Sequence, residues 1–157
     1  ANGGTVYECN IVKRVVDNDG KVIAETNPKV VSTLDDSKGY LELIQLGMNE
    51  VTSGEDGGTG ADAFYGFATT EVDGKQQPDL GGKTGTAQVS KIDLENTAWF
   101  VGYTPFREPE IAVVVYVPNG WAGAKVAPAA RQVMEYYREK QSMTKQVELR
   151  APGSILK

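Results

Sequence analysis

Three strand-like segments follow one another between residues 83 and 117, and a helix-like segment comes directly after them. The strand-like segments are runs rich in β-branched and aromatic residues at 83–89, 98–103 and 111–117. Pro105 and Pro109 lie between the last two runs, so that connection is expected to be a hairpin with a longer loop. From Val126 onward, apolar residues recur at helical spacing and predict a helix over 126–140. Successive strands with hairpin-type connections predict an antiparallel sheet, which such a helix can cover.

The residues before this sheet are expected to form a hairpin, a helix and a loop. A turn signal at residues 18–20 separates two runs of branched residues, so residues 5–25 are expected to form a hairpin. Asp and Ser residues followed by apolar residues at helical spacing predict a helix over 35–53. The four glycines within residues 53–60 make that stretch a loop, and residues 61–80 are expected to stay irregular.

The end of the chain is polar and carries a proline–glycine pair, so residues 141–157 are expected to be a weakly structured tail. Residues 1–140 then form one domain, with its three sheet strands over 82–117. The order of hairpin, helix, three strands and closing helix predicts an α+β fold in which an antiparallel sheet is flanked by helices.

The absence of histidine excludes several kinds of catalytic site. With no histidine and one cysteine, Cys9, the chain has no Ser–His or Cys–His pair, no internal disulfide and no cysteine-built zinc site. Asp56 and Asp62 flank the glycine loop but lack the alternating acidic ligands of a calcium loop, so no metal and no cofactor is expected. The net charge is −5 and no basic cluster stands out, so no nucleic-acid partner is expected.

The apolar segments are also too short for a membrane protein. The longest one, residues 111–117, suits a buried strand and is far too short to span a bilayer. The first residues lack the apolar run of a signal peptide. The chain as written is therefore expected to be soluble and to make no membrane contact of its own.

The segment with the most chemical information is residues 81–87, Gly-Gly-Lys-Thr-Gly-Thr-Ala. Lys83 supplies a positive charge, Thr84 and Thr86 supply hydroxyl donors, and Gly85 leaves room for a ligand against the backbone. On an edge strand, alternation would place Lys83 and Gly85 on one face and the two threonines on the other. The free N–H and C=O groups of such an edge can pair with an extended ligand, and a carboxylate would suit the donors.

Two other interpretations of this segment are an ordinary strand opened by a glycine turn and a phosphate-binding loop. A tight glycine turn can open an ordinary strand with Lys83 solvated, since a three-residue motif often occurs by chance. A phosphate-binding loop also ends in Gly-Lys-Thr, but it needs glycine at position 77, which is Gln77. Such a loop would also lead into a helix, whereas a strand is predicted here.

Residues 82–87 resemble the Lys-Thr-Gly motif of penicillin-binding proteins and serine β-lactamases. Other segments resemble the same domain of the class B-type, high-molecular-weight transpeptidases, in the same order along the chain. These segments are residues 1–7, 46–52, 58–60, 96–105, 111–117 and 127–130. The resemblance covers roughly residues 1–140 and is much more specific than the tripeptide alone. It implies that the chain is the C-terminal portion of a β-lactamase/transpeptidase-like fold.

The resemblance implies a peptidoglycan D,D-transpeptidase, which cross-links stem peptides through an acyl-serine intermediate and is acylated by β-lactams. Lys83 and Thr86 would be catalytic: Lys83 would supply positive potential and orient a hydroxyl of a missing segment, and the Thr86 N–H would be an oxyanion-hole donor. Thr84, Gly85 and Thr86 would bind the substrate, with the threonine hydroxyls holding its carboxylate. The parent protein would act at the extracytoplasmic face of the membrane, anchored by an upstream segment.

The nucleophile of this family is missing from its expected place upstream of Lys83. No Ser-x-Asn sequence occurs, and the Ser-x-x-Lys at residues 142–145 comes after the closing helix. Ser142 is rejected as the nucleophile because an activated serine needs a positioned base and a structured turn or helix. Trp121 could line the substrate cleft, but the role of a surface loop anchor is preferred.

The chain alone is thus expected to be inactive, and two alternatives stay open. It could be a non-catalytic or regulatory module that binds D-Ala-D-Ala or β-lactams. It could also be one fragment of a two-piece domain, whose N-terminal part is a separate chain that carries the serine.

Overall fold

The computed structural model describes residues 1–54, 57–88 and 96–149. Its contacts divide the chain into two compact units, Ala1–Glu42 and Leu43–Lys157. Each unit has its own strand pairs, and helix α1, Tyr40–Glu50, begins in the first unit and continues into the second.

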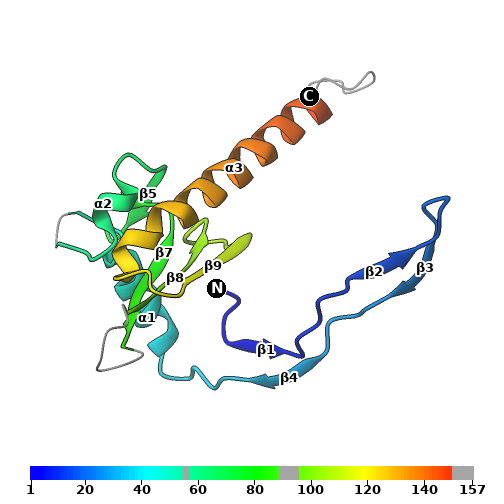
Figure 1. Cartoon of the computed structure of the whole chain (residues 1–157), viewed down its shortest axis with the longest axis horizontal. Helices are drawn as coiled ribbons and strands as arrows, with labels where there is room; N and C mark the ends of the chain where they lie inside the picture. Colours follow the sequence, from blue (N-terminus) through cyan, green and yellow to red (C-terminus); the bar gives the residue numbers. More distant parts are fainter. Residues whose placement is uncertain (55–56, 89–95, 150–157) are drawn as a thin grey trace. The chain divides into compact units, whose positions relative to one another are not determined.

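The first unit consists of two short antiparallel strand pairs (Figure 1). The pairs are β2, Arg14–Val16, with β3, Val22–Glu25, and β1, Thr5–Tyr7, with β4, Val30–Thr33. The Asp17 carboxylate closes the β2–β3 turn, where it accepts hydrogen bonds from the N–H groups of Asp19 and Lys21 at 3.0 and 2.8 Å. The hairpin expected over 5–25 corresponds to β2–β3. Strand β1 pairs instead with β4, which lies beyond that range and follows Pro28.

Helix α1 is shorter than the helix expected over 35–53. The Asp36 carboxylate accepts a hydrogen bond from the N–H of Leu41 at 3.0 Å, as acidic residues at helix starts commonly do. Between them, Gly39 has a φ of 69°, which lies outside the right-handed helical region. The helix therefore begins only after this glycine.

The second unit contains the three-stranded antiparallel sheet that the sequence predicts. Its strands are β7, Gly81–Ala87, β8, Thr97–Thr104, and β9, Ile111–Val117. The strand order is β7–β8–β9, and the register pairs Thr84 with Phe100 and Phe100 with Val115. Since β8 is central, β7 has one edge without a strand partner among the described residues.

Helix α3, Gly123–Leu149, covers one face of this sheet (Figure 1). Its residues Ala127, Ala130 and Met134 are fully buried against the sheet and the segments before β7. The other buried members of this core are Phe64, Phe67, Leu80, Phe100 and Val113. Each large apolar side chain buried in this way contributes about 1.5–3 kcal/mol to folding. Trp99 lies on the opposite face, where its ring is 4.3 Å from that of Tyr116.

Residues 61–80 form regular structure, although the sequence analysis expected them to stay irregular. They contain helix α2, Ala61–Phe64, and the hairpin strands β5, Thr69–Val72, and β6, Lys75–Pro78. Asp73 and Gly74 form the turn with φ values of 49° and 76°. The turn signal is visible in the sequence, but β6 consists of a lysine, two glutamines and a proline, which makes the strand pattern weak.

Helix α3 is longer than expected, since residues 141–149 were assigned to a tail and are helical. They contain no glycine or proline, and polarity alone does not end a helix. Arg131 fastens the helix to α2 by donating to the carbonyl oxygens of Ala63 and Tyr65 at 3.1 and 2.8 Å. The rest of the expected tail lies outside the described residues. None of the helices in the described ranges is long and apolar enough to cross a membrane.

Candidate functional site

The Lys-Thr-Gly segment lies on β7, at the free edge of the sheet. Lys83 and Thr86 are exposed, and Thr84 and Gly85 are half-buried. The cross-strand partners of Thr84 and Thr86 are Phe100 and Ala98, which belong to the face that α3 covers. The threonines thus share one face, as alternation predicts, and Lys83 and Gly85 belong to the other.

The glycines of β7 are required by packing as well as by any ligand. A Cβ at Gly82 would lie 2.8 Å from Phe100 Cζ and 2.9 Å from Thr52 Cγ2. At Gly85, where the sequence analysis expected open space for a ligand, a Cβ would lie 3.2 Å from Trp99 Cβ. Glycine therefore lets β7 lie close to β8 and to the end of α1, in addition to exposing its backbone.

Both threonine hydroxyls have a defined hydrogen-bond partner. Thr84 Oγ1 lies 2.7 Å from Thr59 Oγ1, and either hydroxyl can be the donor. Thr86 Oγ1 accepts a hydrogen bond from the N–H of Gly123 at 3.2 Å. Because an N–H can only donate, the proton of the Thr86 hydroxyl is left for another acceptor.

Thr59 is a site residue that the sequence analysis missed. It belongs to the glycine loop, whose N–H groups at Gly58 and Gly60 donate to the carbonyls of Ser53 and Val51 at 3.1 and 2.8 Å. The sequence does show a hydroxyl residue among glycines before the motif. Nothing in the sequence indicated, however, that this loop would reach β7.

The first residues of α3 pack directly on β7. Gly123 is buried, and a Cβ there would lie 2.5 Å from the Gly85 nitrogen and 2.5 Å from the Trp99 oxygen. The preceding Trp121 has a φ of 68°, its N–H donates to the Asn96 carbonyl at 3.0 Å, and its side chain is 63% exposed. Among the hydrogen bonds of the described residues, Trp121 therefore contributes its backbone, while its side chain faces solvent.

The charges around β7 favour a negatively charged ligand. Lys83 Nζ lies 2.7 Å from the carbonyl oxygen of Thr84, so the ammonium group stays along the strand. The N-terminal end of α3, beside Thr86, adds the positive end of a helix dipole. A lysine, two hydroxyls and a helix N-terminus together suit a carboxylate.

A buried ionic network holds the start of β7. The Asp79 carboxylate is 2.8 Å from Arg138 of α3 and accepts a hydrogen bond from the N–H of Phe106 at 2.8 Å. Thr104 donates its hydroxyl to the Asp79 carbonyl at 2.7 Å. These bonds join α3, the end of β8 and the residue two positions before β7, so they fix the position of the strand.

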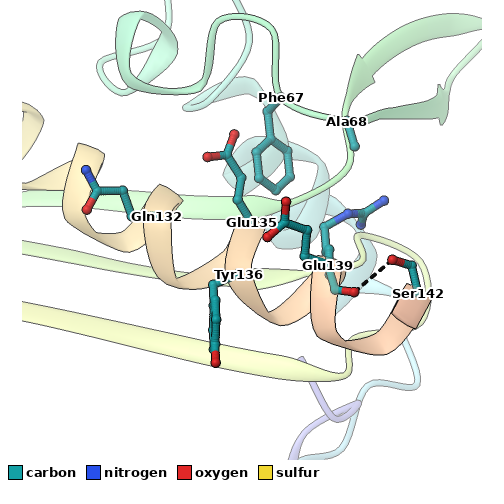
Figure 2. A pocket seen from close by; sticks show the side chains of 8 residues that line it. Phe67, Ala68, Gln132, Glu135, Tyr136, Glu139 and Ser142 are labelled. Carbon is teal, nitrogen blue, oxygen red and sulfur yellow. Dashed lines mark hydrogen bonds between the residues drawn. The ribbon is translucent and has the colours of Figure 1, made fainter. Parts of the chain in front are cut away.

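Ser142 is far from this strand along α3. Its hydroxyl donates to the Glu139 carbonyl at 2.8 Å, in an open cavity of about 700 Å³ beside Phe67 and Ala68 (Figure 2). Nineteen residues separate it from Gly123, which corresponds to about 28 Å along the helix axis. A second Ser-x-x-Lys, at residues 154–157, was overlooked in the sequence analysis and lies outside the described residues.

The described residues contain no group of three or more Cys, Asp or Glu side chains that could hold a metal ion. Asp62 is exposed in the first turn of α2, whereas Asp56 lies outside the described residues. Cys9 is exposed in the connection between β1 and β2.

Comparisons with known proteins identify relatives over most of the chain. The sequence model of the penicillin binding protein transpeptidase domain matches residues 1–135. Penicillin-binding protein H of Bacillus subtilis is 33% identical over 132 residues, which are 76% of this chain and 17% of that protein. Peptidoglycan D,D-transpeptidase MrdA of Haemophilus influenzae is 33% identical over 110 residues, which are 61% of this chain and 15% of that protein. The chain thus spans less than a fifth of the length of these relatives.

The fold is shared with solved structures of the same kind. Penicillin-binding protein A from M. tuberculosis, solved as an imipenem acyl-enzyme complex, superposes with a TM-score of 0.59 at 25% identity. The superposition covers 85% of this chain and 27% of that one. The shared fold confirms the α+β class expected from the sequence.

Proposed function

Because this chain belongs to the penicillin-binding protein transpeptidase family, we propose that it is the C-terminal part of the catalytic domain of a peptidoglycan D,D-transpeptidase. The observation that carries the proposal is the position of Lys83, Thr84 and Thr86 together on the free edge of β7. The similarity to the peptidoglycan D,D-transpeptidase MrdA supports the activity, and the similarity to the acyl-enzyme complex of penicillin-binding protein A supports an acyl intermediate. The same proposal places the active domain outside the cytoplasmic membrane, because its substrate is there.

The proposed reaction transfers an acyl group twice. A serine on an upstream segment gives up its hydroxyl proton to a base and attacks the carbonyl carbon between the two D-alanines of a stem peptide. The amide C–N bond breaks, and the terminal D-alanine leaves as its amine after taking up a proton. The amine of a second stem peptide then attacks the acyl-serine, loses a proton and releases the serine, so that a cross-link forms.

The residues of β7 are proposed to bind and polarise the substrate in this reaction. The hydroxyls of Thr84 and Thr86 donate to the terminal carboxylate, and Gly85 allows the peptide to lie against the strand. The Thr86 N–H stabilises the developing oxyanion. Lys83 contributes positive potential to the site and orients a hydroxyl of the upstream segment. β-Lactams carry a carboxylate as well and would occupy the same donors.

Labelling with fluorescent penicillin tests the proposal, read on a denaturing gel beside intact masses. The longer protein that carries this segment is expected to take up one label, and Lys83→Ala is expected to slow labelling roughly 100-fold. Lys140→Ala removes an exposed lysine of α3 and is the matched control. Label on the isolated chain itself would show that a serine of this chain is acylated and would contradict a nucleophile on an upstream segment. An unlabelled longer protein would contradict the proposed catalysis.

A second candidate is a binding module without catalysis. It is favoured by the carboxylate-binding edge of β7, which this chain forms without a serine from elsewhere. Saturable binding of a D-Ala-D-Ala peptide to the isolated chain, together with an unlabelled longer protein, would favour this candidate. A labelled second polypeptide that copurifies with this chain would instead indicate a two-piece domain.

A further inference from the structure

The hydroxyl of Thr59 lies 2.7 Å from the hydroxyl of Thr84, although the two residues are 25 positions apart in the sequence. We infer that Thr59 is a positioning residue, which orients the Thr84 hydroxyl so that its proton points to the carboxylate of the substrate. The inference rests on the proposed function, since it concerns the same carboxylate site. It adds a residue from the glycine loop to a site that the sequence placed on β7 alone.

The direction of the hydrogen bond follows from the number of protons. A threonine hydroxyl has one proton to donate and two lone pairs to accept with. A carboxylate only accepts, so Thr84 must use its proton for the carboxylate when substrate is bound. The contact between the two threonines then persists only if Thr59 donates to Thr84. Thr59 thereby saturates a lone pair of Thr84 and fixes its rotation about the Cβ–Oγ bond.

Thr86 shows the same arrangement with a donor that cannot be reversed. The N–H of Gly123 donates to Thr86 Oγ1 at 3.2 Å, so the Thr86 proton is also left for an acceptor. The two hydroxyls of the proposed carboxylate site therefore each have a donor from another part of the fold. For Thr84 that donor is a side chain, which a single substitution can remove without altering the backbone.

The glycine loop is held firmly enough to position a hydroxyl. A Cβ at Gly58 would lie 2.2 Å from the Glu50 carbonyl oxygen and 2.5 Å from that of Val51, so the loop packs directly on the end of α1. The N–H of Gly60 donates to the same Val51 carbonyl at 2.8 Å. Thr59 is thus fixed on both sides along the chain and presents an exposed side chain to β7.

The test measures acylation rates of the longer protein that carries this segment. Thr59→Val keeps the shape of the side chain and removes its hydroxyl, and Thr59→Ser keeps the hydroxyl. We expect Thr59→Val to slow acylation by benzylpenicillin roughly 3- to 10-fold, the effect of one hydrogen bond, and Thr59→Ser to restore most of the rate. The methyl ester of benzylpenicillin lacks the free carboxylate, so Thr59→Val is expected to leave its slower acylation unchanged.

Three comparisons separate positioning from a merely structural role. Thr69→Val, at an exposed threonine of β5, is the matched control and is expected to react like the wild type. Thr84→Val is expected to abolish the effect of Thr59→Val, because Thr59 acts through that hydroxyl. Equal slowing with the acid and the ester, or full additivity with Thr84→Val, would overturn the inference.

A binding measurement separates this inference from the proposed catalysis. Isolated chain is titrated with N-acetyl-D-alanyl-D-alanine and with its C-terminal amide, and the amide signals of Thr84 and Thr86 are followed by NMR. Carboxylate-dependent shifts that weaken in Thr59→Val and return in Thr59→Ser support the inference even where the longer protein is not acylated. Acylation of the wild type with unchanged rates and shifts in Thr59→Val would leave the proposed function intact and refute the role of Thr59.

Discussion

Single glycines set how closely the backbone segments of the proposed site approach one another. Gly123 is the clearest case, because its missing side chain lets α3 begin directly on β7 and β8. Its N–H reaches the Thr86 hydroxyl only through this close approach. One residue therefore couples the position of a helix to the orientation of a proposed substrate-binding group.

We expect Gly123→Ala to destabilise the fold by about 1–3 kcal/mol, because the new methyl group meets backbone atoms that cannot rotate away. The same change should weaken carboxylate binding at Thr86. Gly47→Ala is the matched control: a Cβ at this exposed position of α1 meets nothing within 4 Å, so it should stabilise the helix by about 0.5–1 kcal/mol. Urea unfolding of both variants checks the signs, and equal stability of Gly123→Ala and wild type would contradict the packing argument.

Tyr103 is a buried phenol whose hydroxyl has no hydrogen-bond partner among the described residues. Burial raises the pKa of Tyr103 above its ordinary value of 10.0. A raised pKa in the folded state means that its contribution to stability is complete below pH 10 and is lost as the pH rises further. We expect Tyr103→Phe to be at least as stable as wild type at pH 8, since it removes an unsatisfied hydroxyl.

Unfolding at pH 8 and at pH 10.5 measures this effect. The wild type should lose more stability between the two pH values than Tyr103→Phe does. The other tyrosines and the lysines titrate in both proteins, so the difference between them reports Tyr103. A parallel loss in both proteins would show that the phenol is not desolvated.

In addition to the apolar core, a few polar contacts join the secondary-structure elements around β7. The main contacts are made by Arg138, which reaches from α3 to Asp79 before β7 and also lies over the Phe67 ring at 5.7 Å. The Asp79 side chain is only 12% exposed, so water replaces a lost partner poorly.

Arg138→Ala is therefore expected to lower the free energy of unfolding by roughly 1–3 kcal/mol and to loosen the start of β7. Lys125→Ala, which removes an exposed charge from the first turn of the same helix, should change stability by less than about 0.5 kcal/mol. Thermal unfolding compares the two variants. A similar melting temperature for both would mean that the Asp79 network contributes little.

For the molecule as a whole, the division into two units predicts unequal local stability. Strands β1 to β4 form two-stranded pairs with nearly all residues exposed. In contrast, β8 contributes Phe100 to the core under α3, and its Ala98 is also fully buried. Two-stranded pairs without a covered face are marginal in water.

Amide hydrogen exchange of the chain measures this difference directly. Amides of β2 and β3 should exchange within the shortest sampled times, and those of β8 should be protected by several kcal/mol of opening free energy. Equal protection in both units would show that Ala1–Glu42 is stabilised by contacts beyond its strand pairs.

The sequence alone was sufficient for the elements with strong local patterns and for the family. Strand-like runs located β7, β8 and β9 within one or two residues, and the order of motif matches along the chain indicated the transpeptidase family. A turn signal at residues 18–20 marked the β2–β3 turn, and four glycines within residues 53–60 marked the loop before β7. These features depend on residues close together in the chain, so a local pattern determines them.

The tertiary structure decided what depends on residues far apart. The sequence could not show that Thr59 meets Thr84, that the Gly123 N–H meets Thr86, or that Arg138 reaches Asp79, because each contact exists only after α3 and the glycine loop pack on the sheet. The structure also shows which elements form where the sequence pattern is weak. The β5–β6 hairpin forms although its strands are polar, and α3 continues past residue 140 because nothing in that stretch breaks a helix. Local spacing defines where strands and helices can form, and packing determines which side chains then share a site.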